Sequence, residues 1–317
     1  ISHLQSNQYA LFDVSDALIQ PKFNCQTITR KIQEPKNILT DKDTSNDGGL
    51  CINMAIEIDY YTYSQFNFNC YDAVDWALSI LTGVSEVYSS ELNVIIEASH
   101  INVWETNNDP YDGNDMYDYL DALENRWTSS WQLFSIDRDV VHLFTKREIG
   151  GGLANIDGLC SNWSGYAVVG GLSEIVDYDY LTLPFDYLFS WNFMVVAHEL
   201  GHNIGSNHTH DCLWAPDPNY NFSGGHIDNC NMYGSLFDSE ESCYGTPSSL
   251  TLNSSYEYGT IMSYCHVTGQ ADLNMEFHPI IISQALNPGL INSCLNNNCS
   301  DLIYDCGEPL LDVDGDG

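Results

Sequence analysis

The segment from His198 to His208 constrains the fold more than any other part of this chain. It reads H-E-L-G-H-N-I-G-S-N-H, so histidines, a glutamate and glycines stand at fixed offsets. Residues 193–197 before it are apolar and predict that the segment begins on a buried helix. On a helix, His198 and His202 are four residues apart and share one face. Gly205 can adopt the left-handed conformation that ends a helix, so the chain can turn back and bring His208 to the same place.

Histidines at this spacing are typical of a catalytic metal site. Catalytic zinc keeps three protein ligands and an open fourth position, whereas structural zinc is closed by four ligands. We therefore predict that His198, His202 and His208 bind Zn²⁺. Glu199, on the neighbouring face, is placed to hold a water molecule beside the metal and to deprotonate it. The alternative is a histidine-rich surface helix without metal, which the apolar residues 193–197 disfavour.

The charge of the chain limits its partners. Nine basic residues stand against 44 acidic ones, a formal net charge of −35. Nucleic acid and anionic membrane would be repelled, so neither is an expected partner. No apolar run approaches the roughly 18 residues that a membrane helix needs. The acidity fits a solvated surface, and calcium binding or a salt-rich habitat are the two sharper interpretations.

The cysteine content indicates the compartment. Eleven cysteines point to disulfides and an oxidising environment. We therefore expect a secreted, extracellular protein and a monomer. Because Ile1 and the residues after it do not form a charged-then-apolar leader, we expect that any signal peptide has been removed. An odd number of cysteines leaves one that is free, bound to metal or paired outside the chain.

The pattern of apolar residues predicts an α/β (α+β) protein: a twisted mixed sheet with the motif helix, then an irregular disulfide-rich lobe with a closing helix. We expect strands at 52–59, 91–103, 139–145 and 166–170, and helices at 71–88, 115–131, 189–204 and 276–295. The last helix is expected to break near Pro288. Residues 211–258 are rich in Asn, Ser, Gly, Pro and Cys, which is typical of loops held by disulfides.

Residues 259–265, Gly-Thr-Ile-Met-Ser-Tyr-Cys, stand downstream of the histidine motif. Together the two segments resemble the metzincin metalloproteases, in which a methionine turn lies beneath the three histidines. Met262 matches that methionine. Three flanking passages resemble the reprolysin (ADAM and adamalysin) branch and its secreted bacterial relatives: 59–63, 141–145 with the glycine run after it, and 152–169. The resemblance covers residues 50–297 and implies a zincin-like metzincin fold and a zinc-dependent endopeptidase.

The chain also departs from the reprolysin pattern. That pattern places an aspartate directly after the third histidine, whereas Thr209, His210 and Asp211 follow here. His210 offers a competing nitrogen, but the spacing after Gly205 favours His208, and we expect His210 at the surface or behind the ligands. Tyr264 stands where astacins and serralysins carry a tyrosine that ligates zinc or stabilises the oxyanion. A catalytic phenol and a packed tyrosine are equally open interpretations of Tyr264.

Residues 21–27, Pro-Lys-Phe-Asn-Cys-Gln-Thr, resemble the prosegment switch of reprolysins, with one extra residue and Gln in place of Gly. A thiolate from Cys25 would occupy the open zinc position. We therefore expect residues 1–48 to be the tail of a propeptide that inhibits the catalytic domain at 49–297. The alternative is a disulfide between Cys25 and a later cysteine.

The remaining ten cysteines can form five pairs. Family resemblance implies Cys160–Cys294, and local spacing suggests Cys51–Cys70 and Cys299–Cys306. Four others, Cys212, Cys230, Cys243 and Cys265, are expected to pair among themselves in an order that sequence does not determine.

The C-terminal end, residues 298–317, is expected to be a linker and the start of a calcium-binding repeat. It finishes in Asp312-Val313-Asp314-Gly315-Asp316-Gly317, the beginning of a calcium loop without its later ligands. The alternative is an acidic disordered tail.

These observations favour a zinc metalloendopeptidase whose protein or peptide substrate lies extended along residues 152–156. The rival hypothesis is a catalytically silent, calcium-dependent adhesion or binding module on the same scaffold. A non-peptidase zinc hydrolase is a third. The intact Glu199 and the three histidines argue against a catalytically silent module.

Overall fold

The structure is a computed structural model and describes residues 2–5, 8–10, 49–173, 185–228, 230, 259–265 and 273–306. The side chains of 2–10, 185–190 and 305 are not described. Cys25 and the calcium-loop sequence 312–317 therefore lie outside the described residues. Near the N-terminal end, β1 (Ser2–Gln5) and β2 (Gln8–Ala10) form a small antiparallel pair within the expected propeptide tail.

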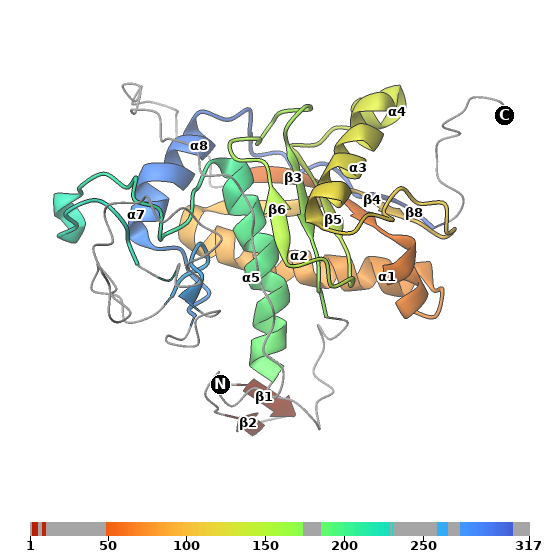
Figure 1. Cartoon of the computed structure of the whole chain (residues 1–317), viewed down its shortest axis with the longest axis horizontal. Coiled ribbons are helices and arrows are strands. Elements are labelled where there is room, and N and C mark those ends of the chain that lie inside the picture. Colours follow the sequence, from red (N-terminus) through yellow and green to blue (C-terminus); the bar gives the residue numbers. More distant parts are fainter. Residues whose placement is uncertain are drawn as a thin grey trace.

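A six-stranded mixed sheet forms the centre of the molecule (Figure 1). Its order is β6-β7-β5-β3-β4-β8, and every neighbouring pair is parallel except β6 with β7. The bounds are β3 Leu50–Ile58, β4 Val94–Val103, β5 Val140–Phe144, β6 Gly152–Ala154, β7 Tyr166–Val169 and β8 Ile303–Asp305. This mixed α/β architecture is compatible with a zincin-like fold.

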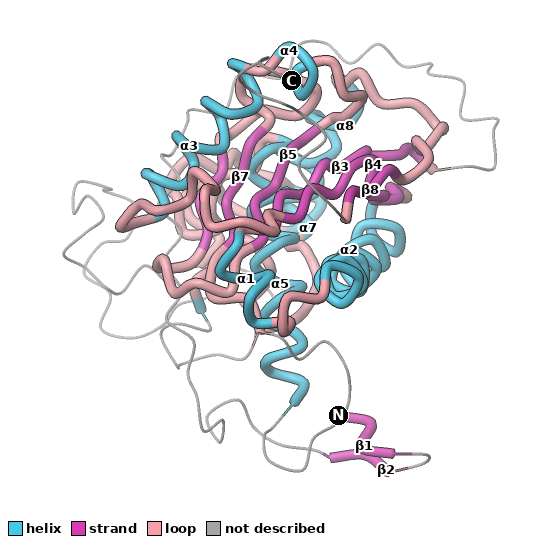
Figure 2. Tube along the Cα trace, turned by 90° about the vertical axis from the view of Figure 1, so that its right-hand side faces the viewer, coloured by secondary structure: helices cyan, strands magenta, loops and turns pink. Residues whose placement is uncertain are grey.

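Helices cover both faces of the sheet (Figure 2). They are α1 Tyr60–Gln65, α2 Cys70–Leu92, α3 Met116–Ser129, α4 Trp131–Phe134 and α5 Phe185–Ile204. Alternate residues of β3 divide two cores, because side chains alternate across a strand. Met54 and Ile56 join the core with α2 and α5, whereas Ala55 joins the core with α3.

Side-chain caps set the helix ends. Asp59, Asn69 and Asp115 begin α1, α2 and α3, because each side chain accepts a hydrogen bond from a backbone N–H of the first turn. Asn93, at φ 53°, ends α2 in the left-handed conformation. The strand that we expected from residue 91 therefore starts only at Val94.

The closing helix differs from its prediction. It runs as α7 Pro279–Ile281, a π-helical segment Ile282–Leu286 and α8 Asn287–Ile291, without a break at Pro288. Proline lacks the N–H that an α-helical hydrogen bond needs. The π segment directly before it widens the helix, so the chain passes the proline without ending.

Three disulfides attach the C-terminal segment to the sheet and its helices. Cys160–Cys294 is confirmed. The local pairs Cys51–Cys70 and Cys299–Cys306 are wrong, because β8 lies beside β4 and brings Cys299 to Cys51 and Cys306 to Cys70. The segment that we assigned to a linker therefore begins with residues that belong to the sheet. In the disulfide-rich lobe that follows α5, Cys230 pairs with Cys265, and Cys212 is also disulfide-bonded.

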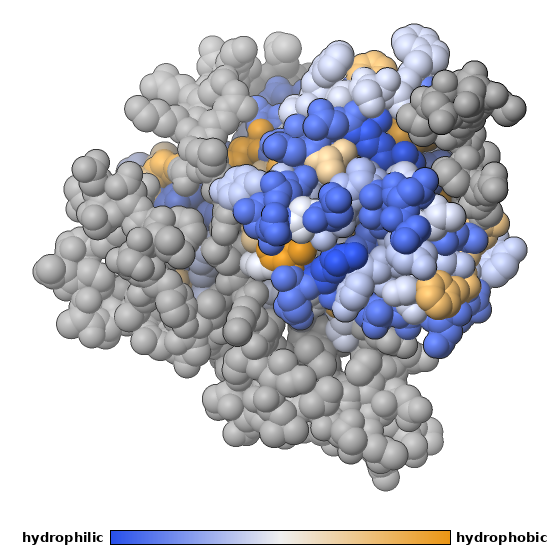
Figure 3. Space-filling model, turned by 45° about the vertical axis from the view of Figure 1, so that its right-hand side comes forward, coloured by the Kyte–Doolittle hydropathy of each residue, from blue (hydrophilic) through white to orange (hydrophobic). Residues whose placement is uncertain are grey.

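The face shown in Figure 3 is mostly hydrophilic, with separate hydrophobic residues among the polar ones. This agrees with the acidic composition of the chain. Within the part of the chain that the structure describes, no helix is both long enough and apolar enough to cross a bilayer.

Candidate metal centre and active site

Helix α5 carries the first half of the histidine motif. Residues 194–197 and Leu200 are buried almost completely, so the helix is anchored in the core on its apolar side. Gly205 has a φ of +125°, and the N–H groups of Gly205 and Ser206 both donate to the carbonyl of Gly201. This closing pattern is the left-handed termination that the sequence predicted. It ends α5 and lets the chain return with His208.

The three histidines come together at one point. The Nε2 atom of His202 lies 3.1 Å from that of His198 and 3.2 Å from that of His208. Two nitrogens that bind one tetrahedral zinc at about 2.0–2.1 Å are about 3.3 Å apart. All three side chains are buried. Their separation therefore fits one ion of the size of zinc.

Hydrogen bonds fix which ring nitrogens face that point. The Nδ1 atoms of His198 and His202 lie 2.6 Å and 2.7 Å from the carbonyl oxygens of Ile261 and Ser206. A carbonyl only accepts, so each Nδ1 carries the proton and each Nε2 presents a lone pair. Lone pairs that face one another are unfavourable unless a cation lies between them. The donor set thus fits a zinc ion, with backbone carbonyls orienting two of its ligands.

Burial favours the neutral form of His202 and His208. It lowers the pKa of His202 to about 4. Burial, followed by the neighbouring His202, His210 and His198, holds the pKa of His208 well below its ordinary value. A neutral imidazole is the form that binds metal, so the site is prepared for a cation at ordinary pH.

The turn after His208 contains an aspartate that the sequence interpretation did not use. The carboxylate of Asp211 accepts from the backbone N–H of His208 at 2.9 Å and lies 3.9 Å from its Nδ1. Thr209, where the reprolysin pattern has an aspartate, instead donates through both its N–H and its hydroxyl to the carbonyl of Met262. The carboxylate of Asp211, three residues after His208 in the sequence, was the signal from which this contact could have been predicted.

Met262 lies beneath the site, as the resemblance implied. Its side chain is fully buried against Gly201 of α5, where a Cβ would come within 2.7 Å of its sulfur. The carbonyls of Ile261 and Met262 hold His198 and Thr209. This turn therefore connects the first ligand with the residue that follows the third.

Tyr264 and His210 form one side of the site. The Tyr264 ring lies 4.8 Å from the rings of both His208 and His210, and 6.2 Å from that of His198. His210 is buried rather than exposed, and its ring stacks on His208 at 4.9 Å with 7° between the planes. It packs behind the ligand and does not replace it. Both interpretations of Tyr264 remain compatible with this position.

Glu199 lies against the edge of the sheet. Its side chain is fully buried, and its outer atoms are those nearest to Gly152 at the start of β6. Because β6 is the terminal strand of the sheet, the carboxylate packs against the edge along which we expect substrate.

The buried side-chain amide of Asn203 connects α5 with β7 and with the residues just after β6. Asn203 donates to the carbonyls of Asn155 and Tyr166 and accepts from Nε2 of His142 at 2.9 Å. The N–H groups of Asp157 and Leu159 donate to the last carbonyls of α5, those of His202 and Asn203. These bonds satisfy helix-end carbonyls and hold the chain after β6 to the motif helix. The sequence analysis did not single out His142 or Asn203.

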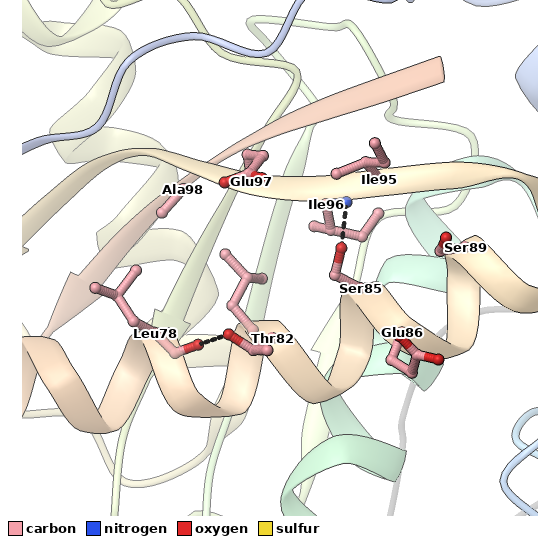
Figure 4. A pocket seen from close by; sticks show the side chains of 10 residues that line it. Leu78, Thr82, Ser85, Glu86, Ser89, Ile95, Ile96, Glu97 and Ala98 are labelled. Carbon is pink, nitrogen blue, oxygen red and sulfur yellow. Dashed lines mark hydrogen bonds between the residues drawn. The ribbon is translucent and has the colours of Figure 1, made fainter. Parts of the chain in front are cut away.

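Three other groups of metal-ligating residues come together in the part of the chain that the structure describes. One of them, His208, His210 and Asp211, shares His208 with this centre. In the other two, Asp139 lies near Cys160 and Cys294, and Asp228 near Cys230 and Cys265, but all four cysteines are disulfide-bonded and offer no thiolate. A hollow of about 240 Å³ lies between α2 and β4, lined by residues such as Leu78, Ser85 and Ile96 (Figure 4). It shares no residue with the histidine cluster.

Comparison with known proteins supports a metallopeptidase. The family model described as metallo-peptidase family M12B, reprolysin-like, matches residues 77–209. This stretch begins in α2 and includes Gly152, Glu199 and the three histidines. The match supports a reprolysin-like metallopeptidase and zinc-dependent proteolysis.

Likeness to solved structures adds nothing to this. A structure described as "Structure of a chaperone-substrate complex" matches at 11% identity with a TM-score of 0.41. The match covers 77% of this chain and 35% of that chain, so this chain spans about a third of its length. So distant a likeness carries no argument about fold or function.

Proposed function

We propose that this chain is a secreted zinc endopeptidase of the reprolysin-like type, in which Glu199 is the general base. The observation that carries the proposal is the convergence of three Nε2 lone pairs beside a buried glutamate, at the edge of a sheet. The intact glutamate disfavours a silent binding module, because such a module has no use for a base beside its metal.

Substrate binding follows from the position of β6. It is the terminal strand, and within the described residues no strand pairs with its outer side. An extended peptide can add there by backbone hydrogen bonds, which gives affinity without a fixed side-chain sequence. The scissile bond would then lie beside Glu199 and the three histidines.

The chemistry divides between metal and protein. When bound, zinc supplies Lewis acidity, which lowers the pKa of a water ligand and polarises a carbonyl. Glu199 accepts the proton of the attacking water and returns it to the nitrogen of the leaving amine. Tyr264, with its ring close to that of His208, donates a hydrogen bond from its phenol to the developing oxyanion.

We further propose that the uncleaved chain is latent, with Cys25 as an inhibitory zinc ligand. The support is the odd cysteine count together with the nine described cysteines, which are all disulfide-bonded. Replacing Cys25 with Ala is expected to raise the activity of the uncleaved chain. No change in activity would argue against latency. Calcium binding at 312–317, the monomeric state and secretion remain predictions.

The test of the main proposal compares Glu199→Gln with Glu97→Gln, a control at an exposed position of β4. Both variants are made in the full chain, with and without Cys25→Ala, and zinc content is measured by atomic absorption. We expect one zinc per chain throughout. Cleavage of casein and of a peptide library should fall by about 10²–10⁴-fold in Glu199→Gln alone, since a general base contributes that much. A chelator or a hydroxamate should abolish cleavage by the parent chain.

Two outcomes would overturn the assignment. The first is a parent chain that binds zinc and cleaves no peptide in either background. The second is normal casein turnover by the Glu199→Gln variant.

A further inference from the structure

Three glycines precede and begin the edge strand, and they are not equivalent. Gly150 and Gly151 have φ angles of +103° and +120°, a conformation that favours glycine. Gly152 is not among the residues with positive φ. Its backbone is therefore one that any residue can adopt, and another cause must explain a glycine at this position.

The space around Gly152 supplies that cause. A Cβ built there would overlap the side chain of Glu199, and its three nearest heavy atoms would be Oε1, Cδ and Cγ of that residue. The Cδ and Cγ atoms would be 2.6 Å away, which no real Cβ contact tolerates. The side chain missing from the edge strand is thus replaced by the carboxylate and its stem (Figure 1 shows β6 beside α5).

Hydrogen bonds hold both the backbone of β6 and that of α5 in place. Gly152 pairs with Val169 in the antiparallel ladder, and Asn203 holds the chain at Asn155 just after β6. On the other side, the Tyr88 hydroxyl donates to the carbonyl of Ala197 and ties α5 to α2. An added methyl group would therefore be accommodated by rotation of the Glu199 side chain.

The histidines would not follow that rotation. The Nδ1 atoms of His198 and His202 are held by carbonyls of Ile261 and Ser206, which do not belong to β6. A change at Gly152 therefore separates the position of the base from the integrity of the metal site.

We propose that Gly152 is a positioning residue for Glu199: the bare edge of β6 sets where the carboxylate stands relative to the metal site. This inference rests on the proposed function. It deepens it by assigning a role in the reaction to a residue that touches neither metal nor reacting atoms.

The test uses Gly152→Ala, with Gly83→Ala as a matched control. The control also pushes a methyl group against a side chain of α5, the ring of Phe193, which is away from the chemistry. Both are made in the full chain, in whichever of the Cys25 and Cys25→Ala backgrounds is the more active. Zinc affinity by chelator competition, thermal unfolding, kcat and KM are measured.

For Gly152→Ala we expect unchanged zinc affinity, unchanged KM within about threefold, and a kcat lower by about 10²-fold, the lower end of general-base effects. Gly83→Ala is expected to keep kcat and KM, whatever it costs in thermal stability. A fall in kcat equal to that of the control, or none at all, overturns the proposal.

A second background separates positioning from general damage. Glu199→Asp shortens the side chain by one methylene and withdraws it from residue 152. In that background, adding Gly152→Ala should change kcat by less than about threefold, because the two residues no longer touch. It should also fold if Gly152→Ala alone does not. An undiminished 10²-fold loss there means that Gly152 acts otherwise.

These results are distinct from a failure of the proposed function. If the parent chain binds zinc but cleaves nothing, the peptidase assignment fails. If the parent chain is active and Gly152→Ala equals it, only the positioning role fails.

Discussion

The two disulfides at the C-terminal end allow a prediction whose size follows from connectivity. Cys51–Cys299 and Cys70–Cys306 each span a long stretch of chain, 248 and 236 residues. Their ends lie close together in sequence, however, about 19 residues apart on one side and about 7 on the other. Once either bond is present, the other closes a ring of only about 26 residues.

Chain entropy converts these lengths into free energies of unfolding. With Cys160–Cys294 intact, the first of the two bonds closes a ring of about 114 residues, about 109 from Cys51 to Cys160 and about 5 from Cys294 to Cys299. Such a bond restricts the unfolded chain by about 5 kcal/mol at 25 °C, and one that closes about 26 residues does so by about 3.5 kcal/mol. Replacing the Cys51 and Cys299 pair with alanine should therefore cost about 3.5 kcal/mol, and so should replacing the Cys70 and Cys306 pair. Replacing all four should cost about 8 kcal/mol, which is more than the sum of about 7 kcal/mol for the two pairs taken separately. That loss is comparable with the whole stability of an ordinary domain.

The assay is equilibrium unfolding in guanidinium chloride under non-reducing conditions, with peptide mapping of the parent chain. Each pair variant should fold, and the quadruple variant should be mostly unfolded. Matched losses of about 5 kcal/mol that add without any excess would show that the bonds do not share a ring, and would refute the reasoning. Mapping that recovers a Cys51–Cys70 peptide would refute the connectivity itself.

Two further predictions concern buried side chains of the site. Burial lowers the pKa of His142 to about 4, below its ordinary value of about 6.5, so the unfolded chain binds a proton that the fold excludes. The contribution of His142 to the free energy of unfolding should be fully present above about pH 6.5 and should fall by about 3 kcal/mol as the pH drops to about 4. His142→Gln should remove one linked proton from the pH dependence of unfolding. An unchanged slope of the free energy of unfolding against pH would contradict the burial argument. Tyr264→Phe removes only the hydroxyl and is expected to lower kcat by about 10²-fold with zinc content unchanged, measured on a peptide substrate. Full activity of the Tyr264→Phe variant would mean that Tyr264 is a packed tyrosine without a catalytic role.

Much of the local structure was predictable because its causes are local. The spacing of His198 and His202, the apolar residues before them and the glycine at 205 each act within a helical turn or two. The observed α5 ends as that pattern requires, with a φ of +125° at Gly205. Alternation of apolar residues likewise located β3, β5 and β7 to within a few residues. The predictions failed at residue 91, where α2 continues to its left-handed cap at Asn93, and at Pro288, where a π-helical segment carries the helix past the proline.

The sequence by itself therefore determined which three histidines come together and the turn that lets His208 join the other two. Only the tertiary structure decided which cysteines meet, because β8 joins the sheet beside a strand some 200 residues earlier. It also decided that Asn203 ties the motif helix to the edge strand, and that Gly152 must be bare because Glu199 occupies the space of its side chain. Such close approaches depend on how separate elements pack, and no spacing within one segment encodes them.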